Sequence, residues 1–471
     1  MVPIVKFPRI VEHYAHFYES VFSEEAFIQF KRYLSGLLIS ENKTITGINQ
    51  LFVTEPRSQS SLNRFLVKGS FSLEALNQSR LEMLESVPRT RIKPTKGVLS
   101  FDDTLLTHYG KSFEKIALLW DHTDNCYRWA HNLVSLHYSD EQTDYPIDLK
   151  LWEPADLEKL EKGLPKAGVK LRESKFALKT DDPLKWRQYL MGVWGRKQKK
   201  PEVEALYQSK LVIAKILLKK WVKNNPDLKL PVTFDGWYTE PSFCRFIDEV
   251  LKLPYVGTLG KTDILLLRSG KQEVGQFAAK LKEEHLEKTK RNPDAAVFKK
   301  ITFRYKGETE IYYSYCRTHR VSGFGKQRLV INYRRKDLTD KPTFFISNRR
   351  RWQAKGITRI RRHRWPVEVF YEESKAEGLD QYQLRDFEGI CRHIAFVAVV
   401  YSLLRAAQQD TVLRDNLQRQ LRIMLEGSAV FWRKATKANS LWDLATIISV
   451  GLLKGESLKK IMLPFTKAVC A

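Results

Sequence analysis

Two apolar β runs that end in aspartate, followed much later by a helix with several carboxylates, constrain the fold of this chain most strongly. The first run, in TKGVLSFDDTLL, leads into Asp102 and Asp103, and the second, in LPVTFDGWY, ends at Asp235. The helix is predicted in RHRWPVEVFYEESK and carries Glu368. If the two strands adjoin in one sheet, their aspartates converge on one edge, and the helix can bring Glu368 across from them.

Three carboxylates in this arrangement suit a pair of Mg²⁺ ions. Mg²⁺ prefers hard oxygen ligands and leaves positions for water and phosphate oxygens. Two such ions on a phosphodiester activate the attacking oxygen and stabilise the leaving one. Of the neighbouring aspartates we favour Asp102, because it directly closes the apolar run. We therefore predict that Asp102, Asp235 and Glu368 are catalytic metal ligands for two Mg²⁺ (or Mn²⁺) ions.

The helix around Glu368 has recognisable ends. Pro366 fits the first helical position and Gly378 fits a C-terminal cap, so Glu368 lies in the first turn, where the helix dipole favours an ionised carboxylate. Lys375 follows seven residues later, nearly two turns on, and shares the face of Glu368. We predict that Lys375 holds a DNA phosphate. The helix is expected to begin directly after the strand TFFISN.

Each of these residues also has an ordinary structural explanation. Asp102 or Asp103 can be turn residues, and Asp235 can cap the helix that follows FDGWYTEPS. Arg364 with Glu368 can be a simple i,i+4 ion pair. The order along the chain (strand Asp, strand Asp, insertion, helix Glu) is what favours a shared site.

The charge balance indicates a polyanionic partner. The chain has 471 residues with 80 Lys and Arg against 54 Asp and Glu, a formal net charge of +26. Such proteins gain affinity for nucleic acid because Lys and Arg release counterions from phosphates. The run RRRWQAKGITRIRRHR, residues 349–364, holds eight Lys and Arg and no acid. We predict a DNA-backbone track that includes Arg350, Arg351, Arg361 and Arg364, although a solvated basic face is the usual explanation of such a run.

Other classes of site fit the sequence poorly. The five cysteines are scattered and form no C-x-x-C pair, which argues against a disulfide framework or zinc site and for a reducing cytosol. In GTLGKT, residues 257–262, the first glycine of a nucleotide-binding loop would fall at Tyr255. The longest apolar run, residues 394–404, is too short for a membrane span. We expect neither ATP binding nor a membrane.

Composition and periodicity divide the chain into five segments. Residues 1–90 read as helices that fit either a helix-turn-helix, with Asn63 and Arg64 contacting DNA, or a bundle without a DNA role. Three β runs within 98–139 predict an antiparallel meander, and residues 202–224 predict one long amphipathic helix. The expected segments are a helical region (1–90), the first part of an α/β core (91–270), a β-rich insertion (271–342), the last part of the core (343–410) and a helical C-terminal region (411–471).

Aromatic residues alternate with basic ones in the insertion and just after it. Tyr312, Tyr313, Tyr315 and Trp352 are candidates to stack on unpaired or flipped bases. Packing of the hairpins themselves explains them equally well.

The motifs LSFDDTLL, VTFDGWY and RWPVEVFYEESKAEGLDQYQLRDFEG resemble those of the DDE transposases of bacterial insertion sequences, specifically the insertion sequence four superfamily and its 701 group. The last motif of that family is Tyr, two residues, Arg, three residues, Glu, six residues, Lys. Arg364, Glu368 and Lys375 match it in register, whereas Arg361 stands at the tyrosine position. The tyrosine's contribution is therefore lost or replaced by a phosphate-binding guanidinium.

The resemblance implies a ribonuclease H-like α/β fold with a β-rich insertion between the second Asp and the Glu. It also implies a cytoplasmic, nucleoid-associated bacterial enzyme that cleaves the ends of its element and joins the 3′-OH to target DNA. Its partners would be terminal inverted repeats, target DNA and a second copy in a homodimer. Two alternatives remain: a catalytically inert or domesticated DNA-binding protein of the same fold, and a metal-dependent DNA nuclease or resolvase.

Overall fold

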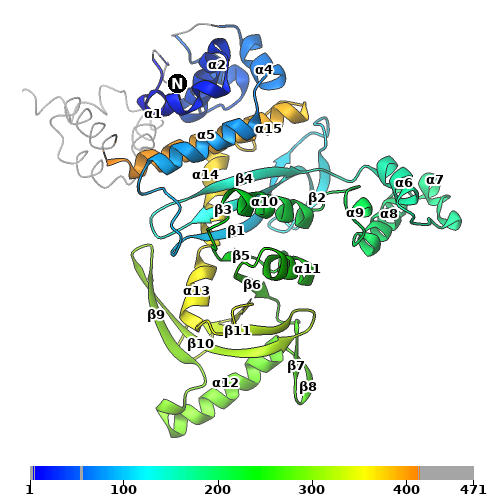
Figure 1. Ribbon diagram of the computed structural model, residues 1–471, viewed down its shortest axis with the longest axis vertical. Coiled ribbons are helices and arrows are strands. Elements are labelled where there is room, and N and C mark those ends of the chain that lie inside the picture. Colours follow the sequence, from blue (N-terminus) through cyan, green and yellow to red (C-terminus); the bar gives the residue numbers. More distant parts are fainter. Residues whose placement is uncertain (1–3, 5, 54–56, 412, 414–471) are drawn as a thin grey trace, which may run out of the picture.

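A single mixed β-sheet runs through most of the computed structural model, which describes residues 4, 6–53, 57–411 and 413 (Figure 1). The strands are β1 Val98–His108, β2 Ala117–Asp121, β3 Cys126–Ser139, β4 Asp144–Trp152, β5 Val232–Phe234, β6 Tyr255–Leu259, β7 Ile264–Leu267, β8 Gly270–Glu273, β9 Lys299–Tyr305, β10 Glu308–Val321, β11 Gly325–Tyr333 and β12 Thr343–Ser347. The sheet has 12 strands in the order β2-β3-β1-β5-β6-β12-β11-β10-β7-β8, with β4 beside β3 and β9 beside β10.

Parallel pairing occurs at the centre of the sheet. β5 lies parallel to both β1 and β6, whereas β3 and β12 pair antiparallel with the outer edges of this group. The short strand β5 is buried along its whole length, as expected for a central parallel strand covered on both faces. Together with the flanking helices, this arrangement confirms the predicted ribonuclease H-like α/β fold.

The predicted meander of three consecutive strands is wrong in its order. β3 lies between β1 and β2, so β1 and β2 are not neighbours. β3 has 14 residues, and its edge away from β1 has room for two strands: β2 pairs with its first residues and β4 with its later ones. The antiparallel meander is therefore β1-β3-β4, and its third strand, β4, was not predicted.

Helices from both ends of the described chain form the region at the top of Figure 1. The N-terminal helices are α1 Arg9–Tyr14, η1 Ala15–Val21, α2 Glu24–Ile39, α3 Ile45–Asn49, α4 Gln59–Lys68 and α5 Leu73–Ser86. They pack against α15 Phe387–Gln409, where Phe396 lies with its ring centroid 5.5 Å from Phe65 and 5.7 Å from Phe30. The N-terminal region is thus helical as predicted. The predicted helical region 411–471 lies almost entirely outside the described residues.

Helix α15 is long and apolar enough to cross a membrane by length and hydropathy, and it is the one such helix in the part of the chain that the structure describes. However, 78% of the apolar window is buried inside the protein. The helix therefore has the burial of a core element.

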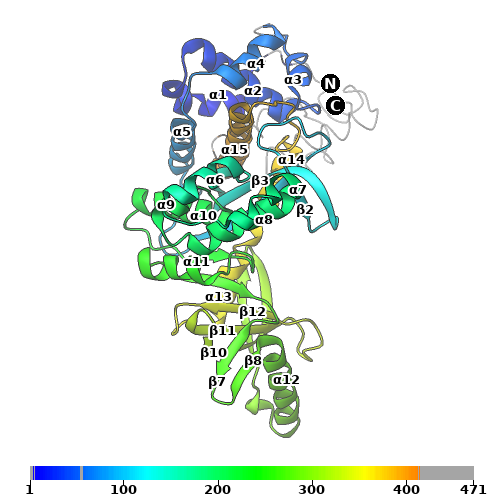
Figure 2. The ribbon, with the colours of Figure 1, turned by 90° about the vertical axis from the view of Figure 1, so that its right-hand side faces the viewer.

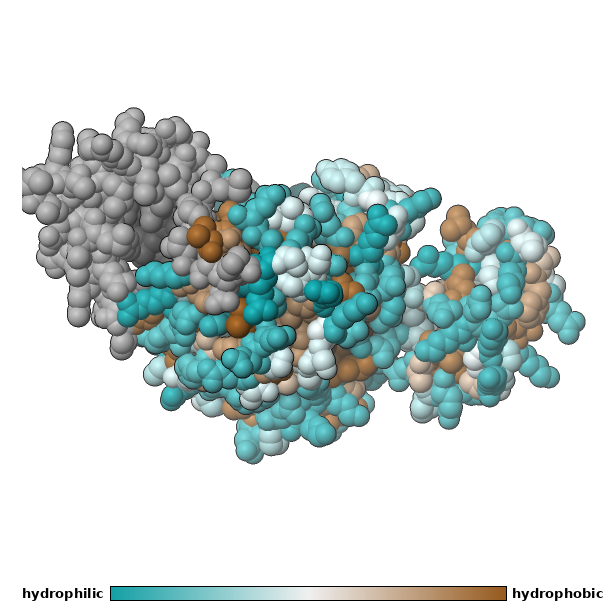
Figure 3. Space-filling view, turned by 90° about the horizontal axis from the view of Figure 1, so that it is seen from above, coloured by the Kyte–Doolittle hydropathy of each residue, from teal (hydrophilic) through white to brown (hydrophobic). Residues whose placement is uncertain are grey.

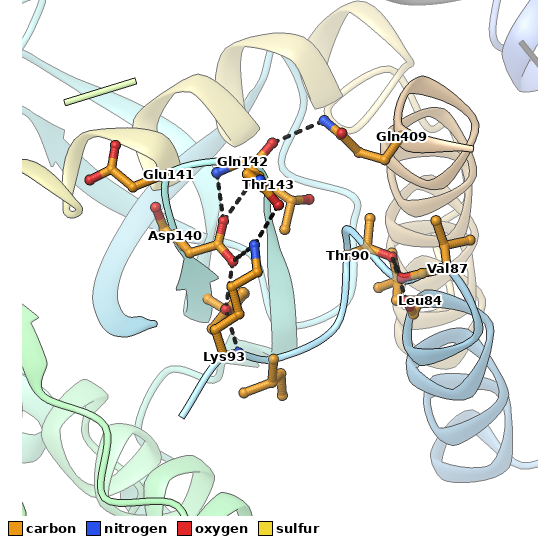
Figure 4. A network of polar contacts seen from close by, with 12 residues as sticks. Leu84, Val87, Thr90, Lys93, Asp140, Glu141, Gln142, Thr143 and Gln409 are labelled. Atoms are coloured by element: carbon orange, nitrogen blue, oxygen red, sulfur yellow. Dashed lines mark hydrogen bonds and ion pairs between the residues drawn. The ribbon is translucent and has the colours of Figure 1, made fainter. Parts of the chain in front are cut away.

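The turn between β3 and β4 connects this helical region to the sheet (Figure 4). Asp140 accepts hydrogen bonds from the backbone amides of Gln142 and Thr143, and its other oxygen pairs with Lys93 at 3.0 Å. Lys93 follows α5 in the chain. Gln409, at the end of α15, donates to the backbone carbonyl of Gln142 at 3.0 Å. One turn of the sheet is thus held by both the N-terminal segment and α15.

Between β4 and the next core helix the chain forms a helical lobe that was not predicted. It contains α6 Leu157–Lys166, η2 Glu173–Lys175, α7 Leu178–Asp181, α8 Pro183–Lys197 and α9 Pro201–Glu204. The helical lobe has its own buried cluster, centred on Leu160, Trp186 and Leu190, and projects sideways from the sheet (Figures 1 and 2). Seen from above, it stands apart from the rest of the protein (Figure 3).

The predicted long helix over 202–224 is two helices. α9 ends at Glu204, and α10 Lys210–Asn224 begins after Ser209, whose hydroxyl accepts a hydrogen bond from the amide of Val212. A serine cap supplies a partner for a free amide of the first turn, which explains the new start. α10 packs on β3 and β4.

The segment 271–342 is rich in strands, but these strands belong to the same sheet. α12 Val274–Arg291 and η4 Pro293–Ala295 precede β9, β10 and β11, and β11 pairs with β12. Tyr312 and Tyr315 are 5% exposed each, so these two rings pack inside the hairpins. Trp352 packs against a buried cluster that includes Ile357. The domain boundaries themselves remain predictions.

Two helices, not one, follow β12. α13 Ala354–Arg362 comes first and α14 Trp365–Ala376 second, so the expectation that the helix of Glu368 directly follows the strand is wrong. Ala354, Ile357 and Thr358 bury one face of α13. A short basic stretch therefore forms a helix of its own, because its few apolar residues lie at helical spacing.

Candidate active site

Asp102 and Asp235 occupy equivalent positions on two neighbouring parallel strands. The last paired residues of β1 and β5 are Phe101 and Phe234, and each aspartate is the next residue in the chain, Asp102 within β1 and Asp235 directly after the end of β5. Parallel strands point the same way, so both carboxylates lie on the same edge of the paired region. The prediction that Asp102 ends its strand is wrong, since β1 continues to His108, where only β3 pairs with it.

Asp102 and Asp103 face opposite sides of the sheet because side chains alternate along a strand. Asp102 faces α14 and Asp103 faces α10, which Figure 1 shows in front of this part of the sheet, with α14 behind it. Asp103 accepts hydrogen bonds from Asn132 at 2.8 Å, Lys210 at 2.9 Å and Tyr238 at 3.0 Å. Three donors occupy Asp103, so this residue is held by the fold, and Asp102 is the better candidate for ligand binding.

Asp235 organises the turn that follows β5. One carboxylate oxygen accepts hydrogen bonds from the amides of Trp237 at 3.0 Å and Tyr238 at 3.1 Å. The next helix, α11 Pro241–Arg245, followed by η3 Phe246–Val250, is capped instead by Glu240, which accepts from Ser242 and Phe243. Asp235 is therefore not the cap of α11, and its second oxygen has no hydrogen bond from within the described residues.

Helix α14 brings Glu368 to the same edge. Pro366 is the second residue of α14, one place later in the helix than predicted, and Gly378 follows the end of α14 with a φ of +98°, as predicted. One turn after Glu368, the Tyr371 hydroxyl donates to the backbone carbonyl of Asp102 at 2.9 Å. This bond joins the catalytic-helix candidate directly to β1.

Arg364 bridges two of the three predicted ligands. Its guanidinium donates from one nitrogen to Asp102 and from another to Glu368. Arg364 was predicted to contact DNA; here it contacts carboxylates, and its side chain is 13% exposed. The i,i+4 pair is real, but the same arginine also ties α14 to β1.

The pKa of Asp102 is raised to about 7. Burial is the largest cause, and the nearby charges of Asp235 and Asp103 raise it further, whereas Arg364 opposes the shift. Burial disfavours the charged form of a carboxyl, and like charges add to that effect. The charge of Asp235 thus contributes to the raised pKa of Asp102, and an added cation would oppose the shift.

Lys375 and both aspartates line one hollow, which we call the acidic groove. Its lining includes the acids Asp102, Asp103, Asp121, Asp124 and Asp235, the cations Arg128, Lys210 and Lys375, and the half-exposed rings of Trp120 and Trp237. Lys375 thus shares a groove with the aspartates as its position on α14 predicted. Trp237 was not predicted as a residue of the site, although its position two residues after Asp235 could have indicated it.

Oxygen donors of the acidic groove suit a hard divalent cation, but the side chains are not gathered around one point. No group of three His, Cys, Asp or Glu side chains within the described ranges has metal-binding spacing. Arg364 fills the space between Asp102 and Glu368. The donor set fits Mg²⁺ or Mn²⁺ in kind, and a guanidinium holds the carboxylates where a cation would.

The predicted basic track 349–364 separates into two parts. Arg359 pairs with Glu141, Arg362 with Glu310, and Arg361 donates to the Thr258 hydroxyl at 2.9 Å. Burial, followed by the charge of Arg364, lowers the pKa of Arg361 to about 10. These arginines are engaged by the fold.

Arg350 and Arg351, at the start of the same run, are exposed. Asn63 and Arg64 are also exposed, on α4, which contacts α3. Residues 54–56 between these helices lie outside the described residues. The exposure leaves all four side chains available to a partner.

One comparison with known proteins identifies a family. The family model described as "DDE superfamily endonuclease" matches residues 16–266, more than half of the chain. The match contains Asp102 and Asp235 and ends before Glu368. No curated protein sequence matches the chain.

Proposed function

Because the chain belongs to the DDE superfamily of endonucleases, a family of nucleic-acid-cleaving enzymes, we propose that it is a DNA transposase of the insertion sequence four superfamily, 701-like group. In this proposal it cleaves the ends of its element and joins the freed 3′-OH to target DNA. The observation that carries the proposal is the register of β1 and β5, which sets Asp102 beside Asp235, together with the Arg364 bridge that brings Glu368 to Asp102.

The proposed metal ligands are Asp102, Asp235 and Glu368. Bound as a pair, Mg²⁺ or Mn²⁺ ions would supply Lewis-acid activation of an attacking oxygen and stabilisation of a leaving oxygen. Burial and the charge of Asp235 raise the pKa of Asp102 against the opposing charge of Arg364, and Asp235 keeps one oxygen free of its own turn. Asp103 lies outside the ligand set because Asn132, Lys210 and Tyr238 already hold it.

Cations of the chain would orient the DNA. Lys375 lies in the acidic groove with both aspartates, so its ammonium is available to a phosphate beside the reacting bond. Arg364 would fix Glu368 and Asp102 until the groove is filled. Asn63 and Arg64, exposed on α4, would contact the terminal inverted repeats, and a second copy would complete the synaptic complex.

A metal-dependent nuclease or resolvase would cleave DNA as a transposase does, but it would not join the ends to target DNA. An inert DNA-binding protein would do neither. The test incubates the purified full chain with labelled element ends, target DNA and Mg²⁺ or Mn²⁺, and then resolves cleaved and joined products. The proposal expects both products. Cleavage without joining would identify a nuclease, and binding of the ends without either product would identify an inert binder.

A further inference from the structure

In a second hollow of the protein, the Lys and Arg side chains of the lining face no acidic residue. Its cations are Arg320 near the end of β10, Lys326 near the start of β11, and Arg349, Arg350 and Arg351 after β12. We call this hollow the basic groove. It contains no Asp or Glu, and it lies in the half of the sheet that Figure 1 shows below β6.

The cations of the basic groove have no acidic partners. None of the five forms an ion pair with a carboxylate of the described residues, although Arg349 donates to the backbone carbonyl of Lys252. Arg320, Lys326, Arg350 and Arg351 are exposed. Like charges gathered in a hollow repel one another and focus a positive potential, and a bound polyanion relieves the repulsion.

Trp352, the tryptophan of the basic groove, is partly covered by the protein. Trp352 packs against the buried cluster of Ala354 and Ile357, and its backbone carbonyl accepts a hydrogen bond from Arg328 at 2.9 Å. Single-stranded nucleic acid is usually held by stacking on aromatic rings, whereas a duplex backbone is held by charge. The lining of the basic groove therefore favours duplex DNA over a single strand.

We propose that the basic groove binds the backbone of duplex DNA at a place separate from the acidic groove. The inference rests on the proposed function only in that the substrate is DNA. α13 lies in the chain between the arginines of the basic groove and α14, which carries Glu368 and Lys375.

The test measures the salt dependence of binding to a short duplex of arbitrary sequence, in EDTA so that no chemistry occurs. Arg320→Ala combined with Lys326→Ala should reduce the slope of log K against log salt by about 0.9 for each lost phosphate contact, hence by up to about 1.8. The matched control is Lys280→Ala combined with Lys290→Ala, which removes the same charge from exposed positions of α12. The control should leave the slope nearly unchanged.

Several outcomes would overturn the proposal. An unchanged slope in the Arg320 and Lys326 variant would remove the basic groove from the DNA contact, and an equal loss in the control would reduce it to a general effect of net charge. Equal binding and equal loss with single-stranded DNA would contradict the choice of duplex. Circular dichroism checks folding, and Arg350→Gln with Arg351→Gln repeats the test if the first variant fails to fold.

A negative result for DNA binding by the basic groove can be distinguished from a negative result for the proposed function. In EDTA, the difference in salt slope between the Arg320 and Lys326 variant and its control reports on the basic groove, whereas cleavage and joining with Mg²⁺ report on the acidic groove. A protein that cuts DNA with an unchanged salt slope in the variant would keep the function and lose the basic groove. A protein that does not cleave DNA but shows a reduced salt slope in the variant would keep the basic groove and lose the proposed function.

Discussion

The acidic groove and the basic groove differ in how their charges are balanced. In and around the acidic groove most carboxylates already have a cation: Asp103 pairs with Lys210, Asp124 with Arg128, and Asp102 and Glu368 share Arg364. In the basic groove no cation is paired with an acid of the described residues. The first groove is organised by internal ion pairs, and the second is left with uncompensated charge for a partner.

The segment 349–364 shows how the two kinds of charge arise from one basic run. Its first three arginines face the basic groove, whereas Arg359 and Arg362 pair with Glu141 and Glu310. Glu141 belongs to the turn after β3, and Glu310 to β10. A basic run in a sequence therefore stays available to a polyanion only where the fold brings no acid to it.

Replacing a proposed ligand should break the acidic groove most severely. Asp102→Asn, Asp235→Asn and Glu368→Gln each keep the size of the side chain and remove the charge of a metal ligand. Loss of an outer-shell partner alone costs 10- to 100-fold, so we expect each change to reduce Mg²⁺-dependent cleavage by at least about 100-fold. Duplex binding in EDTA should be retained. Product formation on labelled ends measures the effect.

Asp124→Asn is the matched control for these variants. Asp124 lines the acidic groove, is half-exposed and lies outside the proposed ligand set. Its substitution should leave cleavage nearly unchanged. Full activity in Glu368→Gln, or a loss in Asp124→Asn as large as in Asp102→Asn, would contradict the proposed set of ligands.

Replacing Arg364, the cation that pairs with Asp102 and Glu368, should show how far the acidic groove depends on this internal ion pair. Arg364→Ala leaves two part-buried carboxylates without a partner, and breaking a buried ion pair costs roughly 3–5 kcal/mol of unfolding free energy. Added Mg²⁺ should restore more stability to this variant than to the original protein, because a cation that binds only the folded state stabilises it. Thermal melting with and without Mg²⁺ measures both effects. An equal Mg²⁺ response in the two proteins would speak against Arg364 holding the cation position.

The raised pKa of Asp102 predicts a pH effect of a few kcal/mol, at about 1.4 kcal/mol per pKa unit. The folded protein binds this proton more tightly than the unfolded chain, whose pKa is near 3.8, so stability falls as the pH rises from about 4 to about 7. Asp102→Asn cannot ionise and escapes this loss. Urea unfolding without divalent cations should therefore show the variant gaining on the original protein between pH 5 and pH 8. A constant difference across that range would contradict the shift.

The smallest expected effect belongs to Lys375. Lys375→Ala removes one charge-assisted phosphate contact and no metal ligand, so we expect a loss of about tenfold in cleavage. The salt slope of duplex binding should fall by about 0.9 at most. Kinetics at several salt concentrations measure both quantities. A loss as large as that of Glu368→Gln would place Lys375 among the essential groups.

The sequence predicted the site where local signals were strong. The apolar runs before Asp102 and Asp235 identified two strands, and Pro366 and Gly378 marked α14. It could not show that Asn132, Lys210 and Tyr238 converge on Asp103, since these contacts join residues 29 to 135 positions apart. β4 was missed because it follows a short turn and pairs beside β2 on the same edge of β3. The helical lobe was missed because its helices other than α8 have ten residues or fewer and its buried core is small.

A calorimetric titration of the metal-free protein with Mn²⁺ tests most directly the central claim, which is that Asp102, Asp235 and Glu368 bind two metal ions. The account predicts two ions per chain, a loss of binding in Asp102→Asn and Glu368→Gln, and retained binding in Asp103→Asn, whose carboxylate is occupied by three donors. Unchanged Mn²⁺ binding in both Asp102→Asn and Glu368→Gln, or a loss confined to Asp103→Asn, would contradict it.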